Sequence, residues 1–231
     1  MFKVGIVGWR GMVGSVLIQR MQEENDFESI DAHFFSTSQS GEKVNILNSQ
    51  ESSLLDAFDI DELIKMDILL SCQGGDYTKK ILNPLREKGW SGHWIDAAST
   101  LRMNSDAMIV LDPINKDAIN TAIKAGNKNW VGGNCTVSLM LLAIHGLIKN
   151  NLVEWVSSMT YQAASGAGAQ NMKELLMQMG ELSGSLNNIK SDSNILDLDN
   201  DVQLTMNSEK FTKKLFTVPL AGSLIPWIDE E

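Results

Sequence analysis

The chain has 231 residues, which is enough to bury a core and to form one large domain or two small ones. Acidic residues outnumber basic ones by 29 to 19, giving a net charge of −10. This balance argues against non-specific nucleic-acid binding, which requires clustered lysine and arginine. The apolar fraction of 43% and the charged fraction of 21% are those of an ordinary soluble globular protein.

No segment is expected to direct the chain into a membrane or out of the cell. Residues 2–8 indicate a strand that runs into a glycine turn, not a secretory signal. The most apolar stretch, residues 137–148, is shorter than the roughly 20 residues of a bilayer span and is expected to be a buried helix. The two cysteines form no CxxC pair, so we expect neither a disulfide framework nor a cysteine-based zinc site. A reducing, cytoplasmic compartment fits this usage best.

Strand-like and helical segments alternate through the first 150 residues. Strands are predicted at 4–8, 32–35, 67–72, 94–97 and 108–111. Helices are predicted at 12–21, 59–66, 78–88 and 113–125, the last beginning with a proline. In the first helix Val13, Val16, Leu17 and Met21 fall on one face. This alternation predicts the α/β class, with a Rossmann-like, doubly wound parallel sheet covered on both faces.

The pattern changes after about residue 133. A long helix is predicted at 136–149, then a strand-like run at 153–163, a glycine-rich turn, and a helix at 171–179. Residues 185–214 are polar and show little periodicity, which indicates a surface excursion or weak order.

Three glycines, Gly8, Gly11 and Gly14, are spaced three apart between the first strand and the first helix. Glycine permits a tight turn and a close approach of the backbone to a pyrophosphate, and the helix N-terminus offers free N–H groups to phosphates. The spacing differs from the common GxGxxG. Because a strand precedes the loop and a helix follows it, a dinucleotide-binding loop is favoured over a glycine turn without a ligand.

The end of the second predicted strand indicates which dinucleotide binds. Folds that bind NAD usually place a carboxylate there to hold the ribose hydroxyls. Here residues 34–38 read Phe-Phe-Ser-Thr-Ser and contain none. Arg10, in the glycine loop, could reach the same region and pair with a 2′-phosphate. The segment favours NADP, the alternative being that the hydroxyl cluster only opens a loop.

Cys135 follows Gly132 and Gly133 and directly precedes the long apolar helix. A cysteine at a helix N-terminus lies near the positive end of the helix dipole, which favours the thiolate. The alternative is a structural small hydrophobe, the usual role of an unpaired cysteine. Cys72, at the end of an apolar strand, is the weaker candidate. A second glycine-rich turn, residues 162–168, could line the same pocket or simply connect a strand to a helix.

Taken together, seven segments resemble bacterial aspartate-semialdehyde dehydrogenases, in the same order and from end to end of the chain. They are Val-Gly-Trp-Arg-Gly-Met-Val-Gly-Ser-Val-Leu at 7–17, Phe-Phe-Ser-Thr-Ser at 34–38, Cys-Gln-Gly-Gly-Asp-Tyr-Thr at 72–78, Trp-Ile-Asp-Ala-Ala-Ser at 94–99, Val-Gly-Gly-Asn-Cys-Thr-Val-Ser-Leu-Met at 131–140, Tyr-Gln-Ala-Ala-Ser-Gly at 161–166 and Val-Pro-Leu-Ala-Gly-Ser-Leu-Ile-Pro-Trp-Ile-Asp at 218–229. This combination is more specific than any one motif.

The resemblance implies a reaction of the aspartate pathway to lysine (through diaminopimelate), threonine and methionine. NADPH and β-aspartyl phosphate would give aspartate β-semialdehyde, NADP and phosphate. Cys135 would attack the acyl phosphate, and hydride would then reduce the thioacyl enzyme. Asn134 would position or polarise the reacting carbonyl, Arg102 would hold the substrate phosphate with its guanidinium fork, and Gln162 would contact the substrate. The cofactor site would be lined by Gly8, Arg10, Gly11, Met12, Val13, Thr37, Ser38, Gln73, Ser165 and Gly166.

The resemblance also implies the domain organisation. Residues 1–133 would form an NADP-binding Rossmann-like domain, and residues 134–231 part of an α+β substrate and dimerisation domain. The expected partners are a small-molecule substrate, phosphate and a second copy of the chain in a homodimer. No metal, nucleic acid or membrane is expected.

Family members continue beyond this sequence and carry there a general acid/base histidine, a substrate-binding arginine, and a glutamate and a lysine near the phosphate. His33, His93 and His145 lie in segments that do not match the catalytic one. The resemblance therefore describes a fragment or a naturally shortened chain, which is expected to catalyse little, since a general base contributes about 10²–10⁴-fold. Two alternatives stay open: a catalytically incomplete NADP-binding or dimer-forming protein, and a related acyl-phosphate reductase such as N-acetylglutamyl-phosphate reductase.

Overall fold

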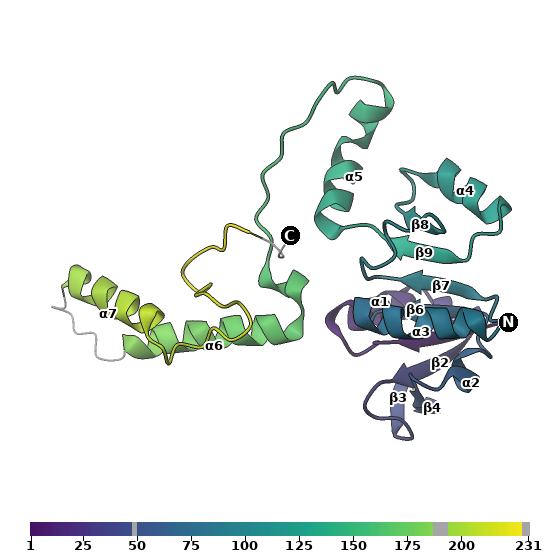
Figure 1. Ribbon diagram of the computed structural model, residues 1–231, viewed down its shortest axis with the longest axis horizontal. Coiled ribbons are helices and arrows are strands. Elements are labelled where there is room, and N and C mark those ends of the chain that lie inside the picture. The colour runs from purple at the N-terminus through teal and green to yellow at the C-terminus, as the bar shows by residue number, and fades with distance from the viewer. Residues whose placement is uncertain (48–49, 187–193, 228–231) are drawn as a thin grey trace. The chain divides into compact units, whose positions relative to one another are not determined.

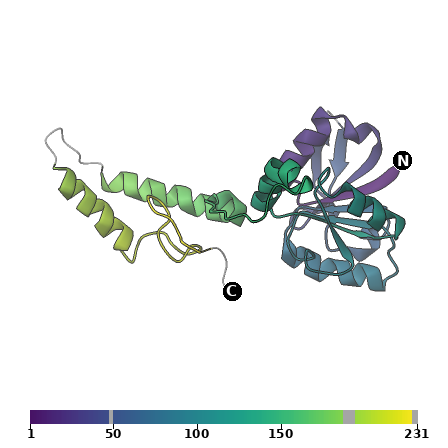
Figure 2. The same cartoon turned by 90° about the horizontal axis from the view of Figure 1, so that it is seen from above.

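The computed structural model describes residues 1–47, 50–186 and 194–227, and Figures 1 and 2 show it in two views. The chain divides into two compact units, Met1–Thr160 and Tyr161–Glu231. Each unit is described by itself. The predicted functional division at residues 133 and 134 lies inside the first unit and stays a prediction.

The first unit is built on a sheet of seven parallel strands in the order β5-β2-β1-β6-β7-β9-β8 (Figure 1). The chain begins in β1, adds β2 and β5 on one side, and then returns to place the other four strands on the far side of β1. Such a reversal opens a crevice at the carboxyl ends of the strands in doubly wound sheets. The predicted parallel α/β class is confirmed. The strands are β1 (Phe2–Val7), β2 (Ile30–Ser36), β5 (Leu55–Asp56), β6 (Ile68–Ser71), β7 (His93–Asp96), β8 (Ala107–Val110) and β9 (Asn129–Gly132).

Helices cover both faces of this sheet, and Figure 2 shows α1 and α3 on opposite sides of it. Side chains alternate along a strand, so β1 sends Val4 and Ile6 to one face and Val7 to the other. Val4 and Ile6 belong to a buried cluster with Ile18 of α1, whereas Val7 belongs to a second cluster with Leu85 of α3. The helices of the first unit are α1 (Met12–Glu23), η1 (Asp26–Glu28), α2 (Ile60–Leu63), α3 (Gly75–Glu87), α4 (Lys116–Lys124) and α5 (Cys135–Lys149).

The buried face of α1 differs from the predicted one. Met21 is buried as predicted and Leu17 is half-buried, but Val13 and Val16 are 57% and 56% exposed, and Gly14 and Ile18 are buried in their place. A Cβ added to Gly14 would lie 2.2 Å from the carbonyl oxygen of Gly8. The close contact of helix and loop therefore sets the rotation of α1, and hydrophobic periodicity does not register a contact made by a glycine.

Several elements begin or end differently from their predicted limits. Helix α4 begins at Lys116 and not at Pro113, because residues 112–115 form a turn. Asn115 holds this turn by donating to the carbonyl of Ile109 at 2.7 Å and accepting the N–H of Leu111 at 2.9 Å. Strands β5 and β9, and the separate hairpin of β3 (Lys43–Leu47) and β4 (Gln50–Ser53), were not predicted. Most are too short to show a period of two.

Helix α5 was predicted to be buried, and this prediction is wrong for the described chain. None of its residues is buried, and Leu139 is 69% exposed. The predicted strand at 153–163 has no regular structure, and within the described residues no strand pairs with it. A run of strand-forming residues becomes a strand only when a neighbouring backbone completes its hydrogen bonds. No helix in the described part of the chain is long and apolar enough to cross a bilayer.

The second unit consists of η2 (Ala164–Ala167), α6 (Ala169–Ser185), α7 (Ile195–Asn207) and the segment that follows them. Helix α7 falls within residues 185–214, for which no regular structure was predicted. Residues 187–193 of that span lie outside the described part. The polar sequence of α7 shows little helical periodicity, so the helix was not predicted. It begins at an N-cap, where the Asn194 side chain accepts the N–H of Leu196 at 3.0 Å.

Polar side chains on one face of α6 hold the segment 208–221. The Glu174 carboxylate accepts the N–H groups of Leu215 and Phe216, at 2.7 and 3.0 Å. The amide oxygen of Gln178, which is fully buried, accepts those of Leu220 and Ala221, at 2.8 and 2.9 Å. Side chains four apart lie on one helical face, so an irregular segment satisfies its backbone by running along α6.

His93 and Trp130 form a contact at the amino ends of β7 and β9. The Trp130 Nε1–H donates to His93 Nδ1 at 2.9 Å, and the two rings stack with centroids 6.1 Å apart. An indole nitrogen can only donate, so Nδ1 is the acceptor of this hydrogen bond. The other ring nitrogen, Nε2, lies 3.3 Å from the Lys128 Nζ. Burial lowers the pKa of His93, as do, to a smaller extent, the charges of Lys128 and Arg86.

Acid is expected to destabilise the first unit through His93. Its pKa in the folded chain lies below the value of about 6.5 expected when unfolded, so the unfolded state takes up the proton first. The contribution is complete above about pH 6.5 and is lost as the pH falls through that value towards the folded pKa. Between about pH 7.5 and about pH 5.5, the Tm should fall further in the parent chain than in His93→Asn, whose Oδ1 can accept from Trp130.

His145→Asn, a substitution on α5, is the matched control and should keep the parent's dependence of Tm on pH. Identical pH dependences of the parent and His93→Asn would contradict the prediction.

Candidate active site

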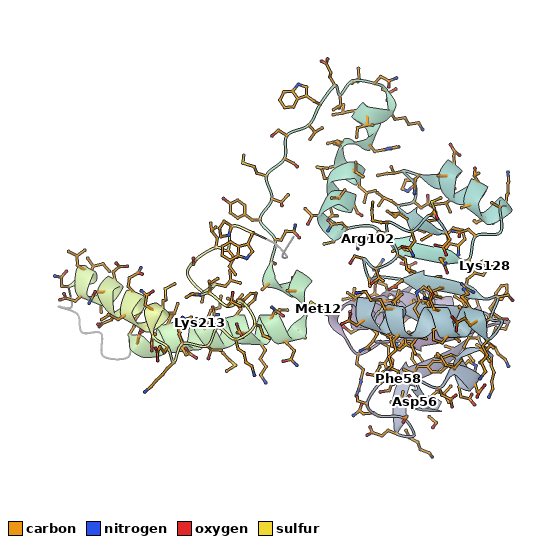
Figure 3. The ribbon with its side chains drawn as sticks, viewed as in Figure 1. Met12, Asp56, Phe58, Arg102, Lys128 and Lys213 are labelled. Carbon is orange, nitrogen blue, oxygen red and sulfur yellow. The ribbon has the colours of Figure 1, made fainter. Side chains whose placement is uncertain are left out.

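The predicted site residues of the first unit follow the carboxyl ends of five adjacent strands. Because the strands are parallel, these ends lie at one edge of the sheet, where doubly wound folds bind their ligands. Figure 3 shows Met12 and Arg102 at this edge and Lys128, which directly precedes β9, at the opposite one. In the order of the sheet, Thr37 and Ser38 follow β2, Gly8 to Val13 follow β1, Gln73 follows β6, Arg102 follows β7, and Asn134 and Cys135 follow β9.

The glycine loop lies directly against the loop that follows β6. Gly8 has φ +77°, and a Cβ there would lie 2.6 Å from the carbonyl carbon of Cys72 and 2.7 Å from the nitrogen of Gln73. Gly11 is the N-cap of α1 and, having no side chain, leaves the first N–H groups of the helix uncapped. A turn of this kind with free N–H groups fits a pyrophosphate.

The turn after β2 is shaped by Ser36. Its hydroxyl accepts the N–H groups of Ser38 and Gln39, at 3.3 and 3.0 Å. Thr37 is half-buried and Ser38 is exposed, so both are within reach of a ligand at the edge of the sheet. Sequence reasoning noted the hydroxyls as a group but did not separate the buried one, which forms the turn, from the two beside it.

Arg10 lies over the ring of Trp9, which packs against β2. Its guanidinium carbon lies 5.3 Å from the centre of the Trp9 ring, and Trp9 packs edge-on against Phe34 of β2 at 5.8 Å. Asp56 of β5 pairs in register with Ser36, the last residue of β2. Its carboxylate accepts the N–H of Phe58 at 2.8 Å. Residues 36–38, at the end of β2, therefore offer hydroxyl groups and no carboxylate.

Cys135 is the first residue of α5, and its side chain is exposed. Its Sγ lies 3.9 Å from the hydroxyl oxygen of Thr136. Asn134 is the N-cap, and its Oδ1 accepts the N–H of Val137 at 3.0 Å. This bond leaves the Nδ2 donors of Asn134 without an acceptor in the described part of the chain. The helix start therefore presents a thiol near the positive end of the dipole with amide donors next to it.

Cys72 lies in a different environment. Burial raises its pKa to about 11, with a smaller contribution from the negative charge of Asp96. It is therefore a neutral thiol at ordinary pH and a poor nucleophile.

Arg102 contacts the turn that leads to Cys135. Its Nε donates to the carbonyl of Gly132 at 2.9 Å, and its Nη2 donates to the carbonyl of Gly133 at 3.2 Å. Two nitrogens of the guanidinium that was predicted to bind the substrate phosphate are therefore bonded to the protein backbone. The third, Nη1, makes no hydrogen bond among the described residues.

Asp96, at the end of β7, is a residue of this edge that sequence reasoning did not single out. It is 1% exposed, and its carboxylate accepts the Thr78 hydroxyl at 2.6 Å, the Trp94 Nε1–H at 3.2 Å and the Ala98 N–H at 2.8 Å. A carboxylate between apolar strand residues was the available signal, since such a group is buried only when it is hydrogen-bonded.

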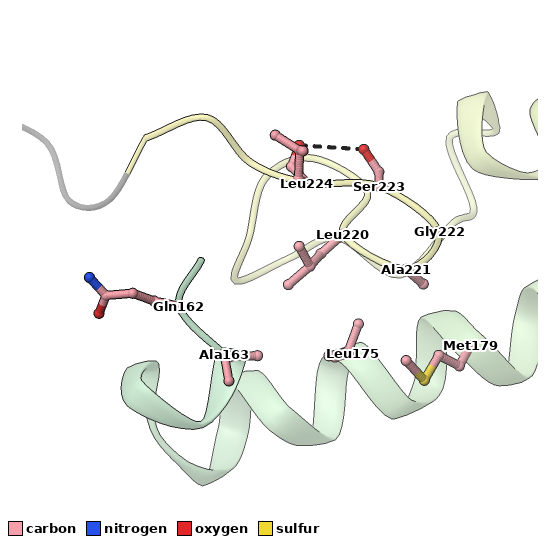
Figure 4. A pocket seen from close by; sticks show the side chains of 10 residues that line it. Gln162, Ala163, Leu175, Met179, Leu220, Ala221, Gly222, Ser223 and Leu224 are labelled. Atoms are coloured by element: carbon pink, nitrogen blue, oxygen red, sulfur yellow. Dashed lines mark hydrogen bonds between the residues drawn. The ribbon is translucent and has the colours of Figure 1, made fainter. Parts of the chain in front are cut away.

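The remaining predicted residues belong to the second unit, and their roles stay predictions. Ser165 and Gly166 are exposed in η2. Gln162 lines an open hollow of about 690 Å³, and its side chain extends away from Leu175 and Met179 (Figure 4). The other lining residues are Ala163, Ala164, Leu220, Ala221, Gly222, Ser223 and Leu224. Within the residues that the structure describes, no cluster of three or more His, Cys, Asp or Glu side chains could hold a metal ion.

The chain is similar to solved aspartate semialdehyde dehydrogenases. The enzyme from Francisella tularensis is 53% identical, with a TM-score of 0.93 over 100% of this chain and 63% of that chain. An aspartate semialdehyde dehydrogenase II from Vibrio cholerae is 24% identical, with a TM-score of 0.72 over 100% of this chain and 60% of that one, which shows a shared fold. The chain thus spans less than two thirds of the length of either protein.

Two family models match the chain. The model of the semialdehyde dehydrogenase NAD-binding domain matches residues 3–122, and that of the semialdehyde dehydrogenase dimerisation domain matches residues 144–231. The first covers the glycine loop, the turn after β2 and Arg102, and the second begins within α5. The chain belongs to the semialdehyde dehydrogenase family.

Proposed function

We propose that the chain acts in the NADPH-dependent reductive dephosphorylation of β-aspartyl phosphate to aspartate semialdehyde, with Cys135 as the nucleophile. The observation that carries this proposal is the position of Cys135. It is exposed, begins α5, and follows the carboxyl end of a strand in the same sheet edge as the glycine loop. The 53% identity with the Francisella enzyme supports aspartate semialdehyde as the product.

The residues of the edge suit an acyl transfer to sulfur. The Cys135 thiolate attacks the acyl carbon, a C–S bond forms, the bond to the phosphate oxygen breaks, and phosphate leaves with the electron pair. The Nδ2 donors of Asn134 stabilise the negative charge that develops on the carbonyl oxygen, and Arg102 offers Nη1 to the phosphate. A bound NADPH would supply the hydride that reduces the thioacyl group to the aldehyde and releases the Cys135 sulfur as the C–S bond breaks.

The cofactor residues favour NADP over NAD. The segment after β2 carries the Thr37 and Ser38 hydroxyls and no carboxylate, and Arg10 lies over Trp9, which packs against Phe34 of β2. An arginine fork matches a 2′-phosphate, whereas a carboxylate there would repel it. The backbone of Gly8 to Val13 would hold the pyrophosphate at the start of α1, with Gln73 on the adjoining loop. Ser165 and Gly166 are candidate cofactor residues on the resemblance alone.

The partners and compartment follow from the same assignment. The match to a dimerisation domain over residues 144–231 supports a homodimer. Gln162 would contact the substrate. Both cysteines are free, and a reducing, cytoplasmic compartment suits a thiol nucleophile.

Cys135 is expected to be acylated by β-aspartyl phosphate. Mass spectrometry of the digested chain should find one aspartyl group on the peptide that contains Cys135 and none on the peptide with Cys72, whose thiolate fraction at pH 8 is about one part in a thousand for a pKa of about 11. Any NADPH formed from aspartate semialdehyde, phosphate and NADP should fall by at least about a thousandfold in Cys135→Ala.

Cys72→Ala is the matched control and should be acylated at Cys135 like the parent. Competition between β-aspartyl phosphate and N-acetylglutamyl phosphate separates the two acyl-phosphate reductases. If iodoacetamide labels Cys135 but β-aspartyl phosphate does not, the proposed reaction is wrong and a cofactor-binding role remains.

Arg10→Gln is expected to weaken NADP binding much more than NAD binding. A hydrogen bond to a charged group contributes about 1.5–3 kcal/mol, so the Kd for NADP should rise about 10- to 100-fold. The Kd for NAD should change little, because NAD lacks the 2′-phosphate. Isothermal titration of both dinucleotides measures this difference.

Arg20→Gln provides the control for the loss of one positive charge from the same region of the chain. Arg20 lies near the far end of α1, paired with Glu23 and Glu24 at 2.6 and 3.2 Å. The Arg20→Gln substitution should leave the dissociation constants for NADP and NAD near the parent values. Equal weakening of NAD and NADP by Arg10→Gln would count against 2′-phosphate recognition.

A further inference from the structure

We propose that Arg102 is a positioning residue for Cys135, in addition to any contact it makes with substrate. Its guanidinium holds the backbone turn that precedes the nucleophile. The proposal rests on the role proposed above for Cys135. Its basis is the pair of hydrogen bonds from Nε and Nη2 to the carbonyls of Gly132 and Gly133, at 2.9 and 3.2 Å.

With Arg102 in place, three consecutive carbonyls before Cys135 are hydrogen-bonded. Gly132 and Gly133 accept from Arg102, and the Asn134 carbonyl accepts the N–H of Ser138 at 2.8 Å. Two glycines in a row give the backbone wide conformational freedom. A Cβ on Gly133 would lie 2.6 Å from the Ser138 hydroxyl oxygen, so a larger residue could not stiffen this position without displacing Ser138. An external donor supplies the constraint instead.

The turn that carries Arg102 is itself fixed to the sheet. The N–H of Ala98 donates to the buried Asp96 carboxylate at 2.8 Å, and the N–H of Arg102 donates to the carbonyl of Ser99 at 2.9 Å. Leu101, next to Arg102, is part of the buried core. The position of Arg102 is therefore determined by β7 and the core, and the two hydrogen bonds transmit that position to the start of α5.

The chemistry of the side chain explains why an arginine fits this position. A guanidinium presents five N–H donors in one plane, so it can serve two neighbouring carbonyls and still keep a nitrogen for a ligand. Here that nitrogen is Nη1. A lysine ammonium is a compact single donor group and could replace the charge without reproducing the fork.

Residue-resolved amide hydrogen exchange on the 231-residue chain tests the proposal. In Arg102→Ala the Val137 and Ser138 N–H groups, which bond to Asn134, are expected to exchange about tenfold faster or more relative to the Ser15 N–H. Ser15 is a suitable reference because its N–H bonds to the Gly11 carbonyl at the start of α1, at 2.8 Å. Arg102→Lys should restore part of the protection. Added guanidinium should restore protection in Arg102→Ala, and methylammonium at the same concentration should restore less.

Arg86→Ala is the matched control. Arg86 also donates to backbone carbonyls, those of Trp90 and Gly92 at 2.9 and 2.8 Å and that of Lys128 at 3.5 Å, and to Asn129 Oδ1 at 2.9 Å. The Arg86→Ala substitution should leave the ratio of the Val137 and Ser15 exchange rates unchanged even if it makes the whole chain less stable.

Three results in Arg102→Ala would overturn the proposal. They are unchanged exchange at Val137 and Ser138, equal acceleration at Ser15, and equal recovery with guanidinium and methylammonium. Exchange requires neither substrate nor turnover. A failure of Cys135 acylation would therefore overturn the proposed function while leaving this measurement to be judged by itself.

Discussion

Contact between backbone segments at the carboxyl edge of the sheet is the constraint on which the candidate site depends. Gly8 lies against the Cys72–Gln73 peptide, and Gly14 lies against the carbonyl of Gly8. Neither position has room for a Cβ, so α1 starts at the carboxyl end of β1, directly against the loop that follows β6. The same contact turns α1 so that its valines face outward. A cofactor loop, a helix orientation and part of the core thus depend on two glycines.

The fold class and the elements that carry the site could be predicted from sequence because each has a local signal. Apolar strand runs alternate with amphipathic helices, and parallel strands place their carboxyl ends together whatever the details of packing. Cys135 was recognisable because two glycines precede it and an apolar helix follows. Arg102 and Gln162 carry no comparable local signal. Their proposed roles came from resemblance to a family, and the hydrogen bonds of Arg102 to Gly132 and Gly133 add what the resemblance did not contain.

The features that escaped prediction depend on contacts between distant residues. Strand β9 is four residues long and is a strand because it lies between β7 and β8. The run at 153–163 has strand-forming residues but no described neighbour to pair with. Helix α5 has the composition of a buried helix, yet none of its residues is buried in the described chain. Whether a strand is paired or a helix is buried depends on which other elements lie next to it. A short stretch of sequence does not contain that information.

The two helices that begin at this edge of the sheet, α1 and α5, differ in their N-caps and in their proposed roles. Helix α1 begins at Gly11 without a side-chain cap, which leaves its first N–H groups to a phosphate. Helix α5 begins at Asn134, whose side chain accepts the N–H of Val137, so one of its first N–H groups is already engaged by the chain itself. The choice of glycine at one N-cap and asparagine at the other therefore favours phosphate binding at α1 and sulfur chemistry at α5.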